Sequence, residues 1–266
     1  MKKCLLHILL LFYIPNCLAQ KDTSAIDIAG ISIENPSGIG GYFGTIGVGI
    51  AGQHKTRSGG RPDANAGVYA GLGDPIRYIG IGASVSIMGV SNRYGSKGNF
   101  GEGSFNIDIS KLLFRAIYLK VGVQNLTFWG LPENAVAAQR SYFGSGTILL
   151  VSKKRKIGTA FSYIALTVGA GNGLFRKEKN FTVDGSGNLN PFYSIAVPVF
   201  RQTNAVVEWS GYDISTGLLS YVKLSKKQAL GIGFEITDYL LKRPRYALTF
   251  SYSLNLLKNY YHDYKR

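Results

Sequence analysis

The sequence predicts an all-β fold: an antiparallel, up-and-down transmembrane β-barrel of about 12 strands, preceded by a cleaved signal peptide. Three observations predict it. The first residues have the layout of a secretion signal, the remainder alternates apolar with small residues at period two, and long and short connections alternate between these stretches. Outer-membrane barrels combine these features, because their strands face lipid on one side and a lumen on the other.

The stretch 1–19 has the three regions of a signal peptide. A basic pair, Lys2 and Lys3, is followed by a short apolar run, and the stretch ends on Ala19 with Cys17 two positions before it. Small residues in these places predict cleavage after Ala19. A lipoprotein with Cys17 as the lipidated residue is the alternative, but the Pro-Asn pair before that cysteine fits it poorly.

The remainder divides into three further segments. Residues 20–37 are expected to form an N-terminal periplasmic segment or a short plug, 38–254 the barrel, and 255–266 a polar C-terminal tail. Within the first of these, the stretch from Ile26 to Ile33 alternates as a strand does, so it is either an extra strand or a short plug. The tail departs from the usual pattern of outer-membrane barrels, whose last strand ends the chain on an aromatic residue.

Period-two alternation runs through the barrel region. The clearest example is the stretch from Tyr78 to Gly89, where Ile, Ala and Val alternate with Gly and Ser. Most such stretches are close to the ~9–11 residues that a tilted strand needs to cross a bilayer. Strands are expected near 38–52, 65–73, 78–90, 100–110, 115–125, 142–151, 158–170, 191–200, 204–210, 213–223, 228–237 and 245–254.

The connections between these stretches differ in length in a regular way. Every second connection is long, and those between them are short, with one exception near Gly211. This pattern predicts short turns on the periplasmic side, long loops outside, and both termini in the periplasm. The long connections are 53–64, 91–99, 126–141 and 171–190, and the short ones are 74–77, 111–114, 152–157, 201–203 and 224–227.

The second face of the strands favours a membrane barrel over a soluble β-sandwich. A sandwich usually carries charges on its exposed face, whereas here that face is Gly, Ser, Thr and Ala. Aromatic residues gather near strand ends, as in the girdles at membrane interfaces. The candidate girdle residues are Tyr78, Trp129, Tyr142, Tyr193, Trp209 and Tyr246.

Several turn motifs resemble those of an uncharacterised group of outer-membrane β-barrel proteins related to the barrels found beside exopolysaccharide-export systems. The motifs are Gly71–Pro75, Val121–Asn125 with Trp129-Gly130, Gly169–Gly173 and Val207–Asp213, and the resemblance spans about 37–255. It implies the barrel fold and a possible link to polysaccharide. It implies no catalytic residues.

Four charged residues fall on the small-residue face and are therefore candidates to line the lumen: Asp108, Lys120, Glu208 and Glu235. A buried charge without a partner is costly, so these side chains should pair with one another or contact water. One interpretation is a salt-bridge network that closes a narrow barrel. The other is a charged constriction that selects solutes; 12 strands lie between filled eight-strand barrels and open sixteen-strand pores.

The sequence gives little indication of cofactor binding, acid-base catalysis or a metal site. The motif Gly47–Gly52 matches a dinucleotide fingerprint but lies within a predicted strand and leads to a polar loop, so no cofactor is expected. His54, with Asp63 or Ser58, is the only candidate acid-base group, since His262 lies in the tail. Both cysteines precede Ala19, and no His or Cys cluster suggests a metal.

The leading function is therefore a passive pore or an export-associated barrel in the outer membrane, not an enzyme. A closed structural or adhesive barrel that presents its extracellular loops is the alternative, and a membrane-embedded hydrolase is a second. The chain carries 30 basic and 15 acidic residues, but its secretion signal argues against nucleic acid as a partner. The expected partners are outer-membrane lipid, lipopolysaccharide and the barrel-assembly machinery, and polysaccharide or small solutes are candidate partners.

Overall fold

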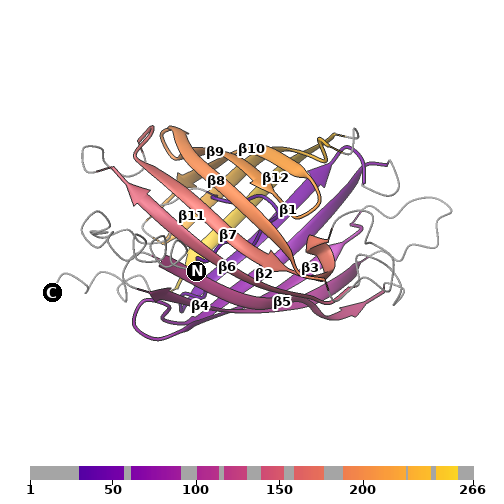
Figure 1. Ribbon diagram of the computed structural model, residues 1–266, viewed down its shortest axis with the longest axis horizontal. Coiled ribbons are helices and arrows are strands. Elements are labelled where there is room, and N and C mark those ends of the chain that lie inside the picture. Colours follow the sequence, from indigo (N-terminus) through magenta and orange to yellow (C-terminus); the bar gives the residue numbers. More distant parts are fainter. Residues whose placement is uncertain are drawn as a thin grey trace, which may run out of the picture.

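A computed structural model shows the chain closed on itself as an antiparallel β-barrel of 12 strands (Figure 1). The expected signal peptide, most of the expected tail and parts of several connections lie outside the residues that the structure describes. The described residues are 30–56, 61–90, 101–113, 117–130, 139–152, 159–176, 188–225, 227–240 and 244–256.

Each strand pairs with its neighbours in sequence, and the first pairs with the last. The closing register runs from Thr45 opposite Asn255 to Gln53 opposite Ala247, so the described sheet has no free edge. The strands are β1 (Thr45–Gln53), β2 (Asp63–Gly73), β3 (Gly80–Met88), β4 (Glu102–Leu113), β5 (Ile117–Trp129), β6 (Ser141–Val151), β7 (Tyr163–Gly171), β8 (Asn190–Phe200), β9 (Thr203–Trp209), β10 (Ile214–Lys223), β11 (Gln228–Thr237) and β12 (Arg245–Asn255).

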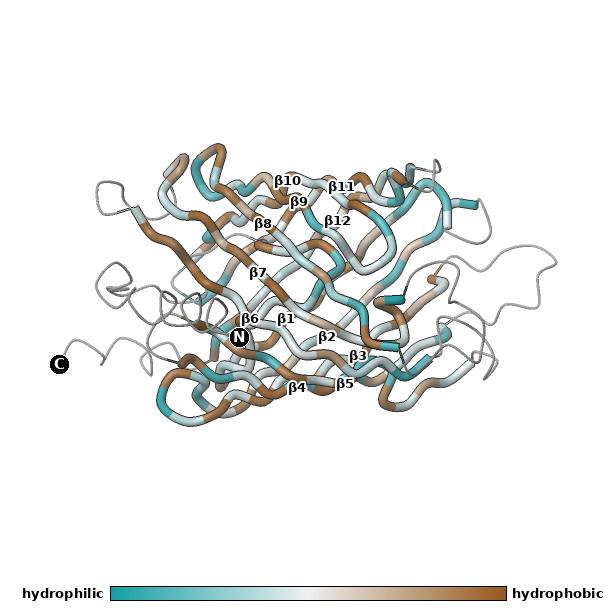
Figure 2. The backbone as a smooth tube through the Cα atoms, viewed as in Figure 1, coloured by the Kyte–Doolittle hydropathy of each residue, from teal (hydrophilic) through white to brown (hydrophobic). Residues whose placement is uncertain are grey.

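The outer face of the barrel is apolar. Along β11, Leu230, Ile232 and Phe234 are exposed, and the glycines between them face inward. Nearly every strand carries exposed Ile, Val, Leu or Phe at alternate positions. Figure 2 shows brown and pale stretches along the strands, with teal stretches mostly towards the barrel ends. A continuous apolar belt of this kind is solvated by hydrocarbon and not by water, so the protein is a barrel of the outer-membrane type.

Most predicted strand boundaries lie within two residues of the observed ones. The larger differences are the ends of β4 and β5, which lie three and four residues later than expected, and the starts of β1 and β7. β1 begins at Thr45, seven residues after the expected start, because Gly41 and Gly44 adopt positive φ angles of 72° and 77° that end an extended course. β7 begins at Tyr163 instead of 158, after Phe161 with φ 55°. The segment before β1 lies inside the barrel.

The two ends of the barrel differ in their connections. One end, called here the long-connection end, carries the links 54–62, 89–101, 130–140 and 172–189; the other, the short-turn end, carries 74–79, 201–202 and 224–227. Two links depart from this rule. The tight link 210–213 lies at the long-connection end, as expected near Gly211, and 152–162 is longer than its neighbours at the short-turn end. The short 3-10 helix η3 (Gly173–Phe175) follows β7.

Most candidate girdle residues are exposed on the outer face. Trp129, Tyr142, Tyr193 and Tyr246 lie towards the long-connection end and Tyr78 at the other, while Trp209 shares the register position of Tyr193 and is half-buried. Their contact with a membrane interface stays a prediction. Among the described residues, no helix has the length and apolar character needed to cross a membrane.

The lipid-facing belt can be tested with a charge placed at its middle. Ile232→Arg should lower the free energy of unfolding in lipid vesicles by about 2–4 kcal/mol, because an arginine at the bilayer midplane is poorly solvated. Ser251→Arg is the matched control, since Ser251 faces inward on the adjacent strand β12. Urea titration of both variants in vesicles measures the difference, and equal effects would contradict the assigned outer face.

Candidate functional site: the occupied lumen

The lumen contains a piece of the chain's own N-terminal region. Residues 30–44, called here the lumen segment, lie between Gly30 beside Leu219 on β10 and Phe43, whose N–H donates to the carbonyl of Gly73 at the end of β2. Described residues of the segment contact β2, β4, β6, β8, β9 and β12. The segment therefore crosses the lumen from one wall to the other.

The carboxylate of Glu208 binds the first half of the lumen segment. Its Oε2 accepts hydrogen bonds from the Ser32 hydroxyl at 2.8 Å and the Ile33 N–H at 2.9 Å. Its Oε1 accepts from the N–H groups of Glu34 at 2.5 Å and Asn35 at 3.2 Å. Four hydrogen bonds from the segment converge on this one side chain, more than on any other described wall residue that contacts the segment.

Side chains of the segment extend this attachment. The Asn35 amide donates to the backbone carbonyls of Tyr193 at 3.2 Å and Trp209 at 2.9 Å. Glu34 accepts from the Tyr212 hydroxyl at 2.8 Å and pairs with Arg245 at 3.3 Å. The segment is thereby tied to the long-connection end of β8, β9 and β12.

Wall side chains also bind the backbone of the segment before this point. The Asn204 amide donates to the Gly30 carbonyl at 3.0 Å, and the Ser194 hydroxyl is 3.5 Å from the carbonyl of Ile31. Both wall residues are buried. Because buried backbone polar groups must be paired, these contacts lower the cost of placing the segment inside the barrel.

The second half of the segment lies flat against the opposite wall. The Gly38 N–H donates to Thr147 at 2.8 Å, and a Cβ on Gly38 would lie 2.0 Å from the Tyr118 carbonyl oxygen. The Ser110 hydroxyl donates to the Gly40 carbonyl, and the Gly41 N–H donates to the Tyr69 hydroxyl, both at 2.7 Å. Glycine is needed here because no side chain fits between the two backbones.

An apolar cluster fills part of the lumen beside these polar contacts. Ile31 of the segment packs there with wall residues of six strands, β5 to β10, and Ile33 and Ile39 pack against its edge. The wall members are Tyr118, Leu149, Tyr163, Ala165, Ala196, Val206 and Leu219. Burial of Ile31 at 7% exposure stabilises the occupied lumen by roughly 1.5–3 kcal/mol.

The four predicted lumen residues occupy inward positions of β4, β5, β9 and β11. Asp108 and Lys120 form an ion pair at 3.6 Å, with side chains 17% and 11% exposed. Glu208 holds the segment, whereas Glu235 lies opposite Gly217 of β10 and forms none of the segment's described hydrogen bonds. The four residues therefore form two separate groups, the ion pair of Asp108 with Lys120 and the two carboxylates Glu208 and Glu235 on either side of β10, and not one salt-bridge network.

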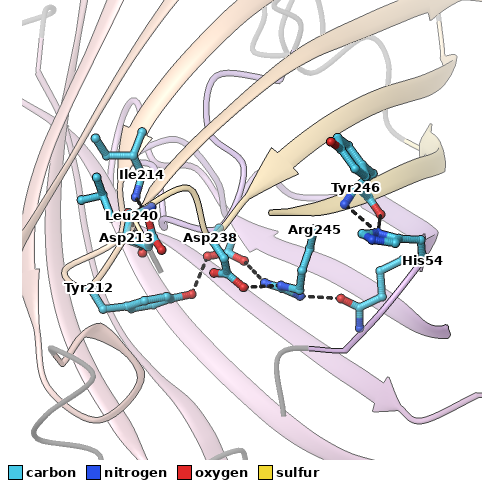
Figure 3. A network of polar contacts seen from close by, with 11 residues as sticks. His54, Tyr212, Asp213, Ile214, Asp238, Leu240, Arg245 and Tyr246 are labelled. Atoms are coloured by element: carbon cyan, nitrogen blue, oxygen red, sulfur yellow. Dashed lines mark hydrogen bonds and ion pairs between the residues drawn. The ribbon is translucent and has the colours of Figure 1, made fainter. Parts of the chain in front are cut away.

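A second polar network closes the long-connection end next to Glu34 (Figure 3). Arg245 binds Asp238, Gln53 and Glu34. The Oδ1 atom of Asp213 accepts the N–H groups of Ile214 and Leu240, which joins two neighbouring connections. This network supports the wall on which the lumen segment rests.

His54 belongs to the rim. Its Nδ1 accepts the N–H of Tyr246 at 3.0 Å, and the two rings lie 5.0 Å apart. Of the partners expected for it, Ser58 lies outside the described residues. Gly47–Gly52 lies within β1, where glycine alternates with outward Val and Ile. Among the described residues, no group of three or more His, Cys, Asp or Glu is arranged to hold a metal ion.

Sequence reasoning missed the residues that pair with the segment's backbone. Asn35, Thr147, Ser194 and Asn204 were read only as parts of a plug or of a polar face. Their roles depend on which wall the segment touches, which alternation does not encode. The one available signal was the glycine-rich run 38–44, whose spacing suits close backbone contact better than a strand.

Comparisons with known proteins concern the fold. No family model matches the chain, and no curated protein matches it. One similar solved structure is the KdgM porin in complex with disordered oligogalacturonate, with 7% identity over 79% of this chain and 98% of that chain and a TM-score of 0.46. The KdgM porin alone has 7% identity over the same shares of the two chains and a TM-score of 0.48. An outer membrane channel from Pseudomonas putida F1 has 9% identity over 88% of this chain and 99% of that chain and a TM-score of 0.48. Identities this low carry no information on solutes.

Removing the charge of Glu208 should release the first half of the segment. Glu208→Gln loses charge-assisted acceptors and places an amide donor against N–H groups, so exchange of the Ile33, Glu34 and Asn35 amides should accelerate at least ~10-fold. Hydrogen exchange followed by mass spectrometry measures this. Glu235→Gln is the matched control and should leave these amides protected; the same protection in both variants would contradict the assigned role of Glu208.

Proposed function

We propose that this protein is an outer-membrane channel whose resting state is closed by its own lumen segment. The observation that supports this proposal is the way in which the lumen segment is held inside the barrel. The segment is a single stretch without regular secondary structure; it is held mainly by hydrogen bonds that involve side chains, with backbone bonds to β2 only where it joins β1. Such a piece can leave the lumen without opening the barrel, whereas a strand cannot.

One side of the lumen, on β1 and β3, has the lining of a water-filled passage. Inward positions of β1 and of Gly80–Ser86 in β3 are Thr, Gly, Ala, Gln and Ser, and inward Asn106 binds Ser84 and Ser86 at 3.1 Å each. Small polar groups of this kind are solvated readily. In this proposal the channel is passive and not enzymatic, and a link to polysaccharide rests only on the resemblance described above.

The proposed channel has a defined orientation in the outer membrane and defined partners there. Its outer face contacts lipid and lipopolysaccharide, and the barrel-assembly machinery inserts it after cleavage behind Ala19. The long-connection end faces outward and the short-turn end faces the periplasm. Surface proteolysis of intact cells tests this orientation, with cleavage expected in 177–187 and not in 153–158.

A second candidate is a permanently closed structural or adhesive barrel. It is favoured by the apolar cluster around Ile31, which anchors the segment beyond its hydrogen bonds. The two candidates differ in one measurable property. A channel conducts when the segment is displaced, and a structural barrel does not.

Gly38→Ala should open the channel. The added Cβ would lie 2.0 Å from a backbone carbonyl oxygen, so the segment must move away from β5 and β6. Planar-bilayer recordings should show frequent openings for this variant and rare ones for the unaltered protein. Gly52→Ala is the matched control, because nothing lies within 4 Å of the added carbon. An absence of conductance from both, in refolded and heat-modifiable protein, would favour the structural barrel.

A disulfide between the segment and the wall should lock the channel. A Cβ on Gly30 would lie 3.1 Å from the Leu219 Cβ, slightly closer than the ~3.5–4.5 Å usual for a disulfide. The only natural cysteines, Cys4 and Cys17, lie in the expected signal peptide. Gly30→Cys with Leu219→Cys should therefore abolish openings when oxidised and regain them on reduction. Openings unaffected by the redox state would show that the segment does not gate the lumen.

A further inference from the structure

The wall behind the first half of the lumen segment is acidic. Glu208 on β9 and Glu235 on β11 both face inward and are separated by a single strand, β10. The residue between them at the level of Glu235 is Gly217, and the space above that glycine is taken by the Ile33 side chain, 3.1 Å from where a Cβ would be. Once Ile33 leaves, Gly217 places no side chain between the two carboxylates.

In the described part of the chain Glu208 has no basic group within ion-pair distance, and the basic group that attracts Glu235 is Arg245, which is already paired with Asp238 and Glu34. Lys120 also faces inward, but it is paired with Asp108. In the closed state four donors of the segment compensate the charge of Glu208. Displacement of the segment removes these donors together, so the charge of Glu208 is then compensated only by what enters the lumen.

A third oxygen next to Glu208 is also unused. Ser215 stands directly opposite Glu208 in the β9–β10 ladder, so both side chains point to the same face. Ser215 is 1% exposed, and its Oγ has no hydrogen-bond partner among the described atoms. A buried hydroxyl without a partner is unusual in a folded protein, and this one adds an oxygen ligand beside the carboxylate.

We propose that the opened lumen selects cations over anions, with Glu208, Glu235 and Ser215 forming the constriction that attracts them. This inference rests on the proposed channel function. Carboxylate rings are the usual device of cation-selective pores, and low-dielectric walls focus their field on the passage. In the sequence most of the surplus basic residues fall between the strands or after the last strand, and salt screens exposed charges over about 8–10 Å.

The test is the reversal potential of the Gly38→Ala channel across a KCl gradient. The expected result is a potential towards that of K⁺. Adding Glu208→Gln or Glu235→Gln should lower the ratio of K⁺ to Cl⁻ permeability roughly threefold or more for each carboxylate removed. Glu102→Gln is the matched control, because Glu102 lies at the start of β4 beside Gly130, away from the constriction, and should change the ratio little.

The outcomes separate the two levels of the proposal. A conducting Gly38→Ala channel that prefers Cl⁻, or that does not discriminate, overturns the cation selectivity and leaves the channel intact. A cation preference that survives both glutamine substitutions overturns the assigned constriction. An absence of conductance in Gly38→Ala and in the reduced cysteine variant overturns the channel itself, and the selectivity with it.

Discussion

Pairing of β1 with β12 is the constraint on which the rest of the structure depends. In hydrocarbon an unpaired N–H or C=O costs several kcal/mol, so a sheet that faces lipid must have no edge. The register from Thr45–Asn255 to Gln53–Ala247 removes that edge. Closure then separates an outer face, which is apolar along the strands, from an inner space bordered by small residues, paired polar side chains and the apolar cluster around Ile31.

Closure also explains how the lumen segment is held. The stretch before β1 alternates like a strand, but a closed sheet offers it no partner. Its N–H and C=O groups are therefore paired by side chains of the wall, such as Thr147 for Gly38 and Asn204 for Gly30. The glycine-rich half needs no side-chain space, which lets it lie against Tyr118 and Gly80. The small-residue inner face thus serves close backbone contact in one part and solvation in another.

Much of the fold could be predicted from the sequence because the alternation of apolar and small residues is local. The strand count and most strand boundaries follow from it, as in β11, where the expected and observed bounds agree. The start of β1 does not follow from the alternation, which extends back to Gly38; the glycine spacing of 38–44 indicates close backbone contact but not which wall the backbone contacts. The inward position of Glu208 followed from parity, whereas its four donors come from residues about 175 positions away.

A carboxylate is suited to the position of Glu208 because it can accept more hydrogen bonds from this stretch of the segment than a neighbouring strand could. An ionised carboxylate has two oxygens with about four acceptor sites and no donor. The segment presents four donors within 32–35, three of them consecutive N–H groups. A neighbouring strand would accept only alternate N–H groups, so it would leave part of this set unpaired. The Glu208 side chain therefore pairs a set of donors that a sheet could not pair, and all four hydrogen bonds from 32–35 depend on this one residue.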